Sequence, residues 1–229
     1  MIARMLESRE LAPDVRHFVF DVPELAEVKF QPGQFVSFSH LIREKTITRA
    51  YSISSTPDGN RFSLCLNRVA DGHMSPHLFA MQPGDTINMK GPIGTFMWRN
   101  RERPAILVAT GTGIAPFRGM VYDELAQPNS RPITLIFGSR YPQGQLYGDE
   151  FRMLATVHPR FTFIPTVTRP DETWTGRTGR VQPIVMEALG EQRELEVYAC
   201  GMKEMTEDIR NRMKELGFDR KQIIVEKYD

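Results

Sequence analysis

The sequence predicts a two-domain protein in which a small antiparallel β-barrel precedes a doubly wound parallel α/β domain. In the first hundred residues, turn signals recur at close spacing and separate short segments rich in strand-forming residues. From Ala105 onward, short apolar runs alternate with helical patterns, as in a parallel sheet with crossover helices. A polar segment, Arg99–Arg103, closed by Pro104, separates the halves. We therefore expect a barrel domain over 1–98, a linker over 99–104 and an α/β domain over 105–229.

The expected barrel strands lie between turn-forming residues. The segment Val15–Phe20 is rich in residues that favour strands. Phe62, Leu64 and Leu66 recur at every second position and so point one way, and Ile87–Met89 repeats this alternation in the next strand. The turn signals between strands are Pro13-Asp14, Pro32-Gly33, Pro57–Asn60, Asp71-Gly72, Pro83–Asp85 and Gly91-Pro92.

The second half contains five short apolar runs of the kind that form buried parallel strands. The clearest helical pattern between them extends from Lys203 to Leu216, with one apolar stripe along it and Gly217 at the expected stop. The predicted strands are Ala105–Ala109, Ile133–Phe137, Phe161–Ile164, Glu196–Ala199 and Ile223–Val225.

The composition excludes several classes of protein. The 229 residues carry 29 Lys and Arg against 28 Asp and Glu, a net charge of +1, which argues against disorder and against a globally basic nucleic-acid binder. Two cysteines, Cys65 and Cys200, are too few for a disulfide scaffold, a four-cysteine iron–sulfur cluster or a cysteine-based structural zinc site. We find neither a membrane-spanning apolar run nor a signal-peptide pattern, so we expect a soluble, cytoplasmic protein.

One pair of histidines has a spacing that is also found in metal sites. His73 and His77 are four residues apart, but Pro76 is expected to interrupt any helix there and the sequence offers no evident third ligand. We therefore predict no metal site.

A glycine-rich turn follows the first strand of the α/β half. The run Val108–Pro116 contains Gly111 and Gly113, and glycines let a backbone turn sharply and approach a ligand closely. The helix that follows offers free N–H groups and a positive dipole end to a pyrophosphate. Because Pro116 stands where the usual motif has a third small residue, an ordinary tight turn is the alternative.

The ends of the next two strands indicate which dinucleotide such a site would prefer. The second strand ends in Ser139-Arg140 without the carboxylate that binds the ribose of NAD, and the third ends in Thr168-Arg169. A hydroxyl beside a guanidinium suits a 2′-phosphate, because hydrogen bonds to an anion from charged donors are strong. The alternative is that these are ordinary solvated residues at strand ends.

Three motifs together resemble the ferredoxin–NADP⁺ reductase family of FAD enzymes. They are Arg49–Ser55, Gly72–Ser75 and Gly111–Pro116, and the resemblance extends from Pro32-Gly33-Gln34 to the C-terminal Val225–Tyr228. It implies an antiparallel Greek-key barrel that binds FAD, followed by an α/β domain that binds NADP(H), without a fused iron–sulfur domain. The pattern-based domain assignment agrees with this implication.

In the barrel, the resemblance implies an FAD site. Arg49 would pair with the pyrophosphate, Tyr51 would stack on the isoalloxazine ring, and the Ser52 hydroxyl would hydrogen-bond the flavin as a catalytic group. Gly72 and Ser75 would hold the other side of the pyrophosphate. The other residues implied at this site are Ala50, Leu66, Asn67, Arg68, Val69, His73 and Met74.

In the α/β domain, the resemblance implies the NADP(H) site. Thr112 and the flanking glycines, Gly111 and Gly113, match the pyrophosphate-binding positions, and Thr168 with Arg169 matches the pair that binds the 2′-phosphate. A second cation would come from the Trp174–Arg180 segment. The remaining residues implied here are Ser139, Arg140, Arg177 with Arg180 as its alternative, Gly201 and Met202.

Three further residues are implied to be catalytic. Cys200 would line the nicotinamide pocket as a packing and positioning group, and its alternative role is that of a small buried residue. Glu226 would be the acid near the flavin, and Tyr228 the aromatic ring that the nicotinamide displaces. Asp229, one residue beyond this aromatic, departs from the family ending and leaves a frayed tail as the alternative.

The resemblance implies a monomeric enzyme that exchanges a hydride with NADP(H) and single electrons with ferredoxin or flavodoxin. Two alternatives stay open: the NAD(P)H-dependent reductase component of a multicomponent oxygenase, and a non-catalytic flavin-binding regulatory protein. Neither a nucleic-acid partner nor a membrane span is expected. The cations expected to attract an acidic carrier are Arg43, Lys45, Lys90, Arg99, Arg101 and Arg103.

Overall fold

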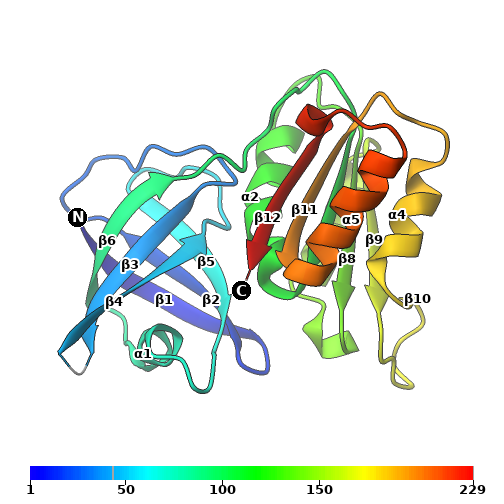
Figure 1. The fold of residues 1–229 in the computed structure, drawn as a ribbon. Helices are drawn as coiled ribbons and strands as arrows, with labels where there is room; N and C mark the ends of the chain where they lie inside the picture. Colours follow the sequence, from blue (N-terminus) through cyan, green and yellow to red (C-terminus); the bar gives the residue numbers. More distant parts are fainter. Residues whose placement is uncertain (43, 229) are drawn as a thin grey trace. The chain divides into compact units, whose positions relative to one another are not determined.

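The computed structural model describes residues 1–42 and 44–228 and divides the chain into two compact units (Figure 1). The first comprises Met1–Met97 together with Ala115–Tyr122. The second comprises Trp98–Ile114 and the chain from Asp123 onward, and residues 99–104 fall within it. Arg43 and Asp229, both named above, lie outside the described residues.

Six antiparallel strands form the first unit: β1 (Ile2–Ala12), β2 (Val15–Asp21), β3 (Phe35–Ile42), β4 (Lys45–Ser52), β5 (Arg61–Asn67) and β6 (Thr86–Ile93). Their order in the sheet is β4-β3-β6-β1-β2-β5, so β6 is inserted between β3 and β1, as in a Greek key. The sheet closes on itself, because Ile53, just after β4, forms a bridge with Leu64 of β5. The predicted barrel is confirmed.

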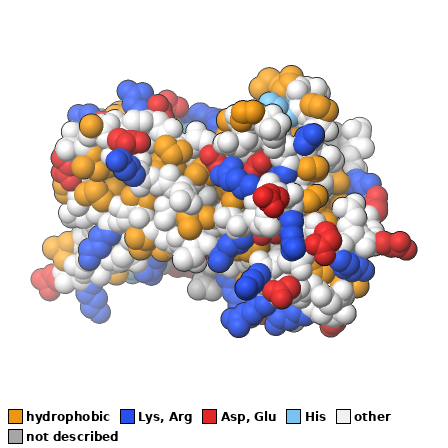
Figure 2. All heavy atoms as spheres, turned by 90° about the horizontal axis from the view of Figure 1, so that it is seen from above, with side chains coloured by type: hydrophobic (Ala, Val, Ile, Leu, Met, Phe, Trp, Pro, Cys, Tyr) orange, Lys and Arg blue, Asp and Glu red, His pale blue; other side chains and the backbone are white. Residues whose placement is uncertain are grey.

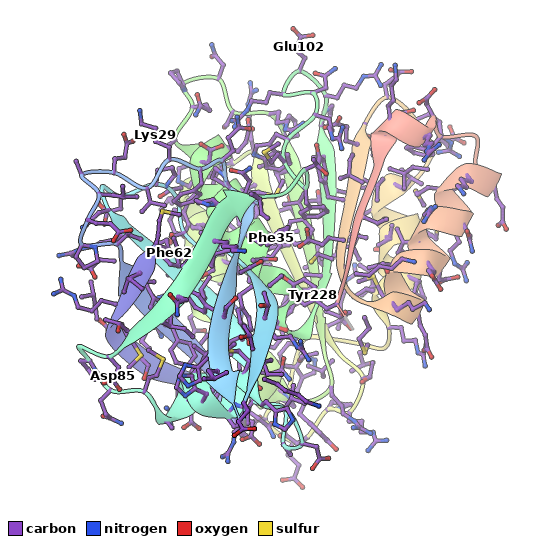
Figure 3. All side chains as sticks on the ribbon, turned by 60° about the vertical axis from the view of Figure 1, so that its left-hand side comes forward. Lys29, Phe35, Phe62, Asp85, Glu102 and Tyr228 are labelled. Carbon is purple, nitrogen blue, oxygen red and sulfur yellow. The ribbon has the colours of Figure 1, made fainter. Side chains whose placement is uncertain are left out.

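Aromatic rings fill the interior of the barrel. Phe20, Phe38 and Phe62 are at most 1% exposed, and the rings of Phe20 and Phe62 stack with centroids 5.7 Å apart. Burying each of these side chains contributes about 1.5 to 3 kcal/mol. Figure 3 shows Phe62 among the barrel strands, with Lys29 and Asp85 at the surface.

A short helix, α1 (Met74–Ala80), follows β5 and buries Met74 and Leu78 in the barrel core. The prediction that Pro76 interrupts any helix here is wrong, because Pro76 occupies the first turn, where the backbone N–H has no intrahelical partner to lose. On the same helix, the ring of His77 stacks on His40 of β3, with centroids 3.7 Å apart.

His17 of β2 is a buried titratable group in the barrel wall. It is 7% exposed, and burial lowers its pKa to about 3, helped by the positive charges of Arg118 and Arg9. An unfolded histidine titrates near pH 6.5. The unfolded chain therefore binds a proton that the folded barrel excludes, and stability falls as the pH drops below about 6.5.

We expect the free energy of unfolding to fall by roughly 1.4 kcal/mol per pH unit between about pH 6.5 and 5, or about 2 kcal/mol in all. Urea denaturation across this interval measures the loss. His17→Gln removes the titrating group and should flatten most of this dependence. The same slope in both proteins would contradict the assignment.

Six strands also form the second unit: β7 (Ala105–Thr110), β8 (Ile133–Ser139), β9 (Phe161–Val167), β10 (Arg177–Thr178), β11 (Glu196–Met202) and β12 (Ile223–Tyr228). All neighbours pair in parallel in the order β10-β9-β8-β7-β11-β12. The chain proceeds outward from β7 in one direction and then returns to its other side, so the strand order reverses between β7 and β11. The predicted doubly wound sheet is confirmed.

Within this unit the helices that accompany the sheet are α3 (Gly148–Val157), α4 (Val181–Leu189) and α5 (Lys203–Glu215), whereas most of α2 (Ile114–Leu125) is grouped with the first unit. In Figure 1, α4 and α5 cover one face of the sheet. The end of α5 follows the prediction, because Gly217 has a φ of +82° and Phe218 N–H donates to the Met213 carbonyl over 3.0 Å. Within the described part of the chain, no helix has both the length and the apolar composition to cross a membrane.

A buried group of charges, which we call the ionic cluster, lies at the edge of this sheet where β8 and β11 begin. Arg131, 3% exposed, places its Nη1 3.2 Å from Glu196 and its Nε 3.6 Å from Glu124. Its guanidinium lies 4.0 Å from the ring centroid of Trp98. Arg101 approaches Glu124 from the surface at 3.3 Å, so two cations face two buried carboxylates. Arg131 also donates to the carbonyls of residues 100 and 103, which fastens residues 98–103 to this unit.

Candidate functional site

The glycine-rich turn follows β7 at the point where the strand order reverses. Gly113 packs against β11 so tightly that a Cβ there would lie 2.3 Å from the Cys200 carbonyl oxygen. Gly201, at φ +134°, would place a Cβ 2.4 Å from Thr110 Oγ1. Gly111, by contrast, has a φ of +54° and open space on its Cβ side. The ends of β7 and β11 thus approach each other at glycines, with no side chain between their backbones. The open turn beside them leads into the N-terminus of α2, and this geometry suits a phosphate.

The ends of β8 and β9 bring the two predicted hydroxyl–arginine pairs together. Thr168 N–H donates to the Ser139 carbonyl over 3.1 Å, and Arg169 N–H donates to the Arg140 carbonyl over 2.8 Å. These bonds continue the parallel pairing beyond the strands. Both arginines are exposed, and Arg169 Nη1 lies 3.3 Å from the Tyr141 hydroxyl.

Arg177 is engaged by another residue. Its guanidinium forms two hydrogen bonds with the Glu187 carboxylate, of 2.6 and 2.7 Å. The pKa of Glu187 is lowered by these hydrogen bonds and by the arginine charge. Arg180, the alternative cation, is exposed and stands just before α4, next to Gly179.

Cys200 lies at the carboxyl end of β11, beside β12. In the parallel register it pairs with Glu226, and Met202 pairs with Tyr228. Cys200 is fully buried, which raises the pKa of its thiol; the Glu226 charge raises it further, while a hydrogen bond with Tyr228 opposes both. A neutral thiol suits packing and positioning better than nucleophilic attack. Met202 itself is 63% exposed.

In the barrel, the run from Arg49 to Ser52 occupies the end of β4. Tyr51 packs on Phe38 with ring centroids 5.9 Å apart, and burial raises the pKa of its hydroxyl. Arg49 and Ala50 are exposed, whereas Ser52 is 8% exposed. Since side chains alternate along a strand, Arg49 and Tyr51 share one side and Ala50 and Ser52 the other.

The loop after β5 is held tightly by its own hydrogen bonds. Val69 N–H donates to Ser75 Oγ over 2.9 Å, and Gly72 N–H donates to the Val69 carbonyl over 2.9 Å. The Ser75 hydroxyl, which was predicted to hold the pyrophosphate together with the Gly72 backbone, therefore also braces this loop. Of the other predicted residues here, Leu66 and Met74 are buried, and Asn67, Arg68 and His73 are exposed.

Gln145 is a residue beside the candidate NADP(H) site that the sequence does not single out. It follows the turn Pro142–Gly144, and its amide nitrogen bonds both Ser139 and Thr166. A single glutamine after a turn gives no signal in the sequence. The hydrogen-bond partners of its side chain depend on how two strand ends that are distant in sequence are paired.

Two family models together match most of the chain. The oxidoreductase FAD-binding domain matches residues 3–98, and the oxidoreductase NAD-binding domain matches residues 107–211. The matches correspond in order to the barrel and the parallel sheet.

Among curated proteins, ferredoxin--NADP reductase B of Sorangium cellulosum is 35% identical over 239 residues, covering 99% of this chain and 97% of that protein. Protein RfbI of Salmonella typhimurium is 32% identical over 82% of this chain, which spans only 56% of RfbI.

Solved structures have the same fold. The Amycolatopsis cytochrome P450 reductase GcoB superposes with a TM-score of 0.88 at 27% identity, over 98% of this chain and 68% of that chain. A Neisseria gonorrhoeae ferredoxin NADP⁺ reductase with bound FAD and NADP superposes with a TM-score of 0.79 at 24% identity, over 99% and 98%. With an FAD-binding barrel, an NAD(P)-binding α/β unit and a relative that matches along its whole length, the chain belongs to the ferredoxin–NADP reductase family of flavoprotein oxidoreductases.

Proposed function

We propose that this chain is a cytoplasmic, monomeric reductase that exchanges a hydride with NADP(H) and single electrons with ferredoxin or flavodoxin. The observation that carries the proposal is the pairing of two arginine-bearing strand ends, at Arg140 and Arg169, with no carboxylate at the end of β8. The full-length likeness to the Sorangium cellulosum reductase supports it. We assign residues 1–98 to FAD binding, 99–104 to the linker and 105–229 to NADP(H) binding.

The barrel residues fit FAD, which when bound supplies the exchange between paired and single electrons. We assign the exposed Arg49 guanidinium to the pyrophosphate and the ring of Tyr51, fixed against Phe38, to the isoalloxazine. Ser52 would offer its hydroxyl to the flavin. We assign Gly72 and Ser75 to the other side of the pyrophosphate, where the Ser75 hydroxyl, which accepts from Val69 N–H, still has its own proton to donate.

The α/β residues fit NADP(H). The open side of Gly111 and the N-terminus of α2 would take the pyrophosphate, with Thr112 and Gly113 completing the turn. Arg140 and Arg169 would bind the 2′-phosphate. Because Arg177 is paired with Glu187, Arg180 is the better candidate for an additional cation from the Trp174–Arg180 segment. We assign the buried Cys200 to the nicotinamide pocket, with Glu226 as the nearby acid and Tyr228 as the ring that the nicotinamide replaces.

Some of the cations proposed to attract an acidic carrier already form ion pairs within the chain. Arg101 pairs with Asp123 and Glu124, and Arg103 lies 3.2 Å from Glu194. Lys45 and Lys90 are exposed on the barrel. Figure 2 shows a face on which acidic and basic side chains are interspersed, as the net charge of +1 would suggest. Carrier binding would therefore rest on local attraction and depend on ionic strength.

Anaerobic stopped-flow bleaching of the flavin absorbance, with NADPH and NADH side by side, tests the proposal. We expect fast bleaching by NADPH and slow bleaching by NADH. Subsequent reduction of ferredoxin or flavodoxin by the bleached enzyme would identify the carrier. Equal or faster bleaching by NADH would overturn the NADP(H) assignment.

Arg169→Ala should reduce the preference for NADPH over NADH by roughly 10- to 100-fold, because one charge-assisted hydrogen bond to the 2′-phosphate is lost. The ratio of kcat/KM for the two coenzymes measures this, and the rate with NADH should change little. Arg160→Ala, at an exposed arginine that donates to the Ser130 carbonyl, is the control. An unchanged ratio would place the phosphate site on other residues.

A second candidate is the reductase component of an oxygenase, supported by the 27% identity to the Amycolatopsis cytochrome P450 reductase. Such a role would need an iron–sulfur group from outside these 229 residues, because they contain Cys65 and Cys200 as their only cysteines. Fast bleaching by NADH would favour it. Purified protein without flavin would instead favour the third alternative, a non-catalytic regulatory protein.

A further inference from the structure

The side-chain amide of Gln145 connects two strand ends next to the proposed phosphate site. Its nitrogen donates one hydrogen bond to Ser139 Oγ over 2.8 Å and another to the Thr166 carbonyl over 3.0 Å. Because the carbonyl of Thr166 can only accept, the nitrogen must face it and the amide orientation is fixed. Both hydrogens of the amide are thereby used.

The connection extends to a third segment through Thr166. This residue is fully buried, and its hydroxyl donates to the Gly179 carbonyl over 2.9 Å. Gly179 N–H in turn donates to the Val167 carbonyl over 2.8 Å. Ser139 directly precedes Arg140, Gly179 directly precedes Arg180, and Thr166 lies three residues before Arg169. The Gln145 amide therefore links the segments that lead to Arg140 and Arg169, and Thr166 connects these segments to the one that leads to Arg180.

The Ser139 hydroxyl is part of this connection. It accepts from Gln145 and gives its single proton to the Tyr141 carbonyl over 2.7 Å. Tyr141 begins the turn from which Gln145 extends, so the two bonds close a ring between the end of β8 and its loop. With its proton committed, the Ser139 hydroxyl is better placed to brace the loop than to donate to an anion.

We propose that Gln145 is a positioning residue for 2′-phosphate recognition, which it serves by holding the segments of Arg140 and Arg169 in register. The proposal rests on the proposed NADP(H) function. Guanidinium groups on exposed loops bind a phosphate well only if their backbones are already ordered, since otherwise binding must order them.

The experiment measures adenosine 2′,5′-bisphosphate and 5′-AMP binding to the FAD-loaded enzyme by calorimetry. The two ligands differ only in the 2′-phosphate, so the ratio of their Kd values isolates its contribution. Gln145→Met keeps the side-chain length and removes both hydrogen bonds, and Gln145→Asn keeps the amide on a shorter arm in case the first variant fails to fold. Gln143→Met, at an exposed glutamine of the same turn, is the matched control.

We expect both Gln145 variants to reduce the wild-type Kd ratio by about tenfold, with 5′-AMP affinity changed by less than about twofold. Amide hydrogen exchange at Thr168 and Arg169 should accelerate, because their hydrogen bonds to the β8 loop loosen. A retained ratio, or an equal loss for both ligands, would overturn the role of Gln145 while leaving the NADP(H) function standing. Wild-type enzyme that binds the two ligands equally would instead overturn the NADP(H) function itself.

Discussion

Gly113→Ala should lower the rate of flavin reduction by NADPH by about a hundredfold. The added Cβ would lie 2.3 Å from the Cys200 carbonyl oxygen and 2.7 Å from Gly201 Cα. Both are backbone atoms of a strand paired on its two sides with β7 and β12, so neither can yield without moving the sheet. A displacement of about 1 Å in the turn that positions the dinucleotide is sufficient for a loss of this size. We also expect a loss of roughly 3 kcal/mol in stability.

Gly111→Ala is the matched control, two residues earlier in the same turn. Its Cβ meets nothing within 4 Å, and the substitution suffers only from the positive φ of +54°. We expect a loss of about 1 to 2 kcal/mol in stability and a smaller effect on NADPH. Stopped-flow reduction and thermal unfolding of both variants give the comparison. Equal effects of the two substitutions would contradict the prediction, because they would show that the close packing of Gly113 against β11 is not important for NADPH.

Arg131→Met should destabilise the protein by about 3 to 5 kcal/mol, the largest effect on stability that we expect. The substitution leaves the carboxylates of Glu124 and Glu196 buried, at 1% and 2% exposure, without their main counter-charge. It also removes the donor to the carbonyls of residues 100 and 103. Thermal unfolding should show a Tm lowered by roughly 10 °C.

Arg101→Met provides the contrast, because its side chain is 44% exposed and its ion pairs are screened by solvent. We expect a loss below about 1 kcal/mol. Adding Glu196→Gln to Arg131→Met should restore part of the lost stability, since one uncompensated charge is removed. A Tm for Arg131→Met close to that of Arg101→Met would argue against the ionic cluster as a stabilising element.

Periodicity in the sequence predicted the helices that bury one face and the strands that are buried on both faces. The stripe of α5 and its stop at Gly217 follow from spacing alone, and all five predicted parallel strands are present. The apolar run Phe161–Ile164 is only part of β9, which continues through Pro165 to Val167 and so ends next to Thr168-Arg169, where the sequence predicts the end of this strand. Because β10 pairs only with Thr166 and Val167, the outer edge of β9 at Pro165 has no partner strand, and proline is tolerated there.

The candidate site was predictable only in its local parts. Gly111 and Gly113 could be noticed because glycine marks a backbone requirement at its own position. The ion pair between Arg177 and Glu187 could not be predicted, because it depends on how β10 lies against α4. Arg131 and Gln145 gave no signal, because charged and amide side chains are normally exposed and their partners here are distant in sequence.

The barrel unit is not one continuous stretch of the chain, since Ala115–Tyr122 of α2 are grouped with Met1–Met97. Within this unit, Arg118 donates to the Ser54 carbonyl over 3.0 Å, and the ring of Phe117 lies 5.6 Å from that of Phe96. A fragment that ends at Met97 would therefore lack the α2 residues that pack in this unit, and the ring of Phe96 would lose its partner and become exposed to water. In recombination between relatives, and in engineered chimeras, we therefore expect the two units to be exchanged only together. Additional domains should be tolerated only before the first unit or after the second.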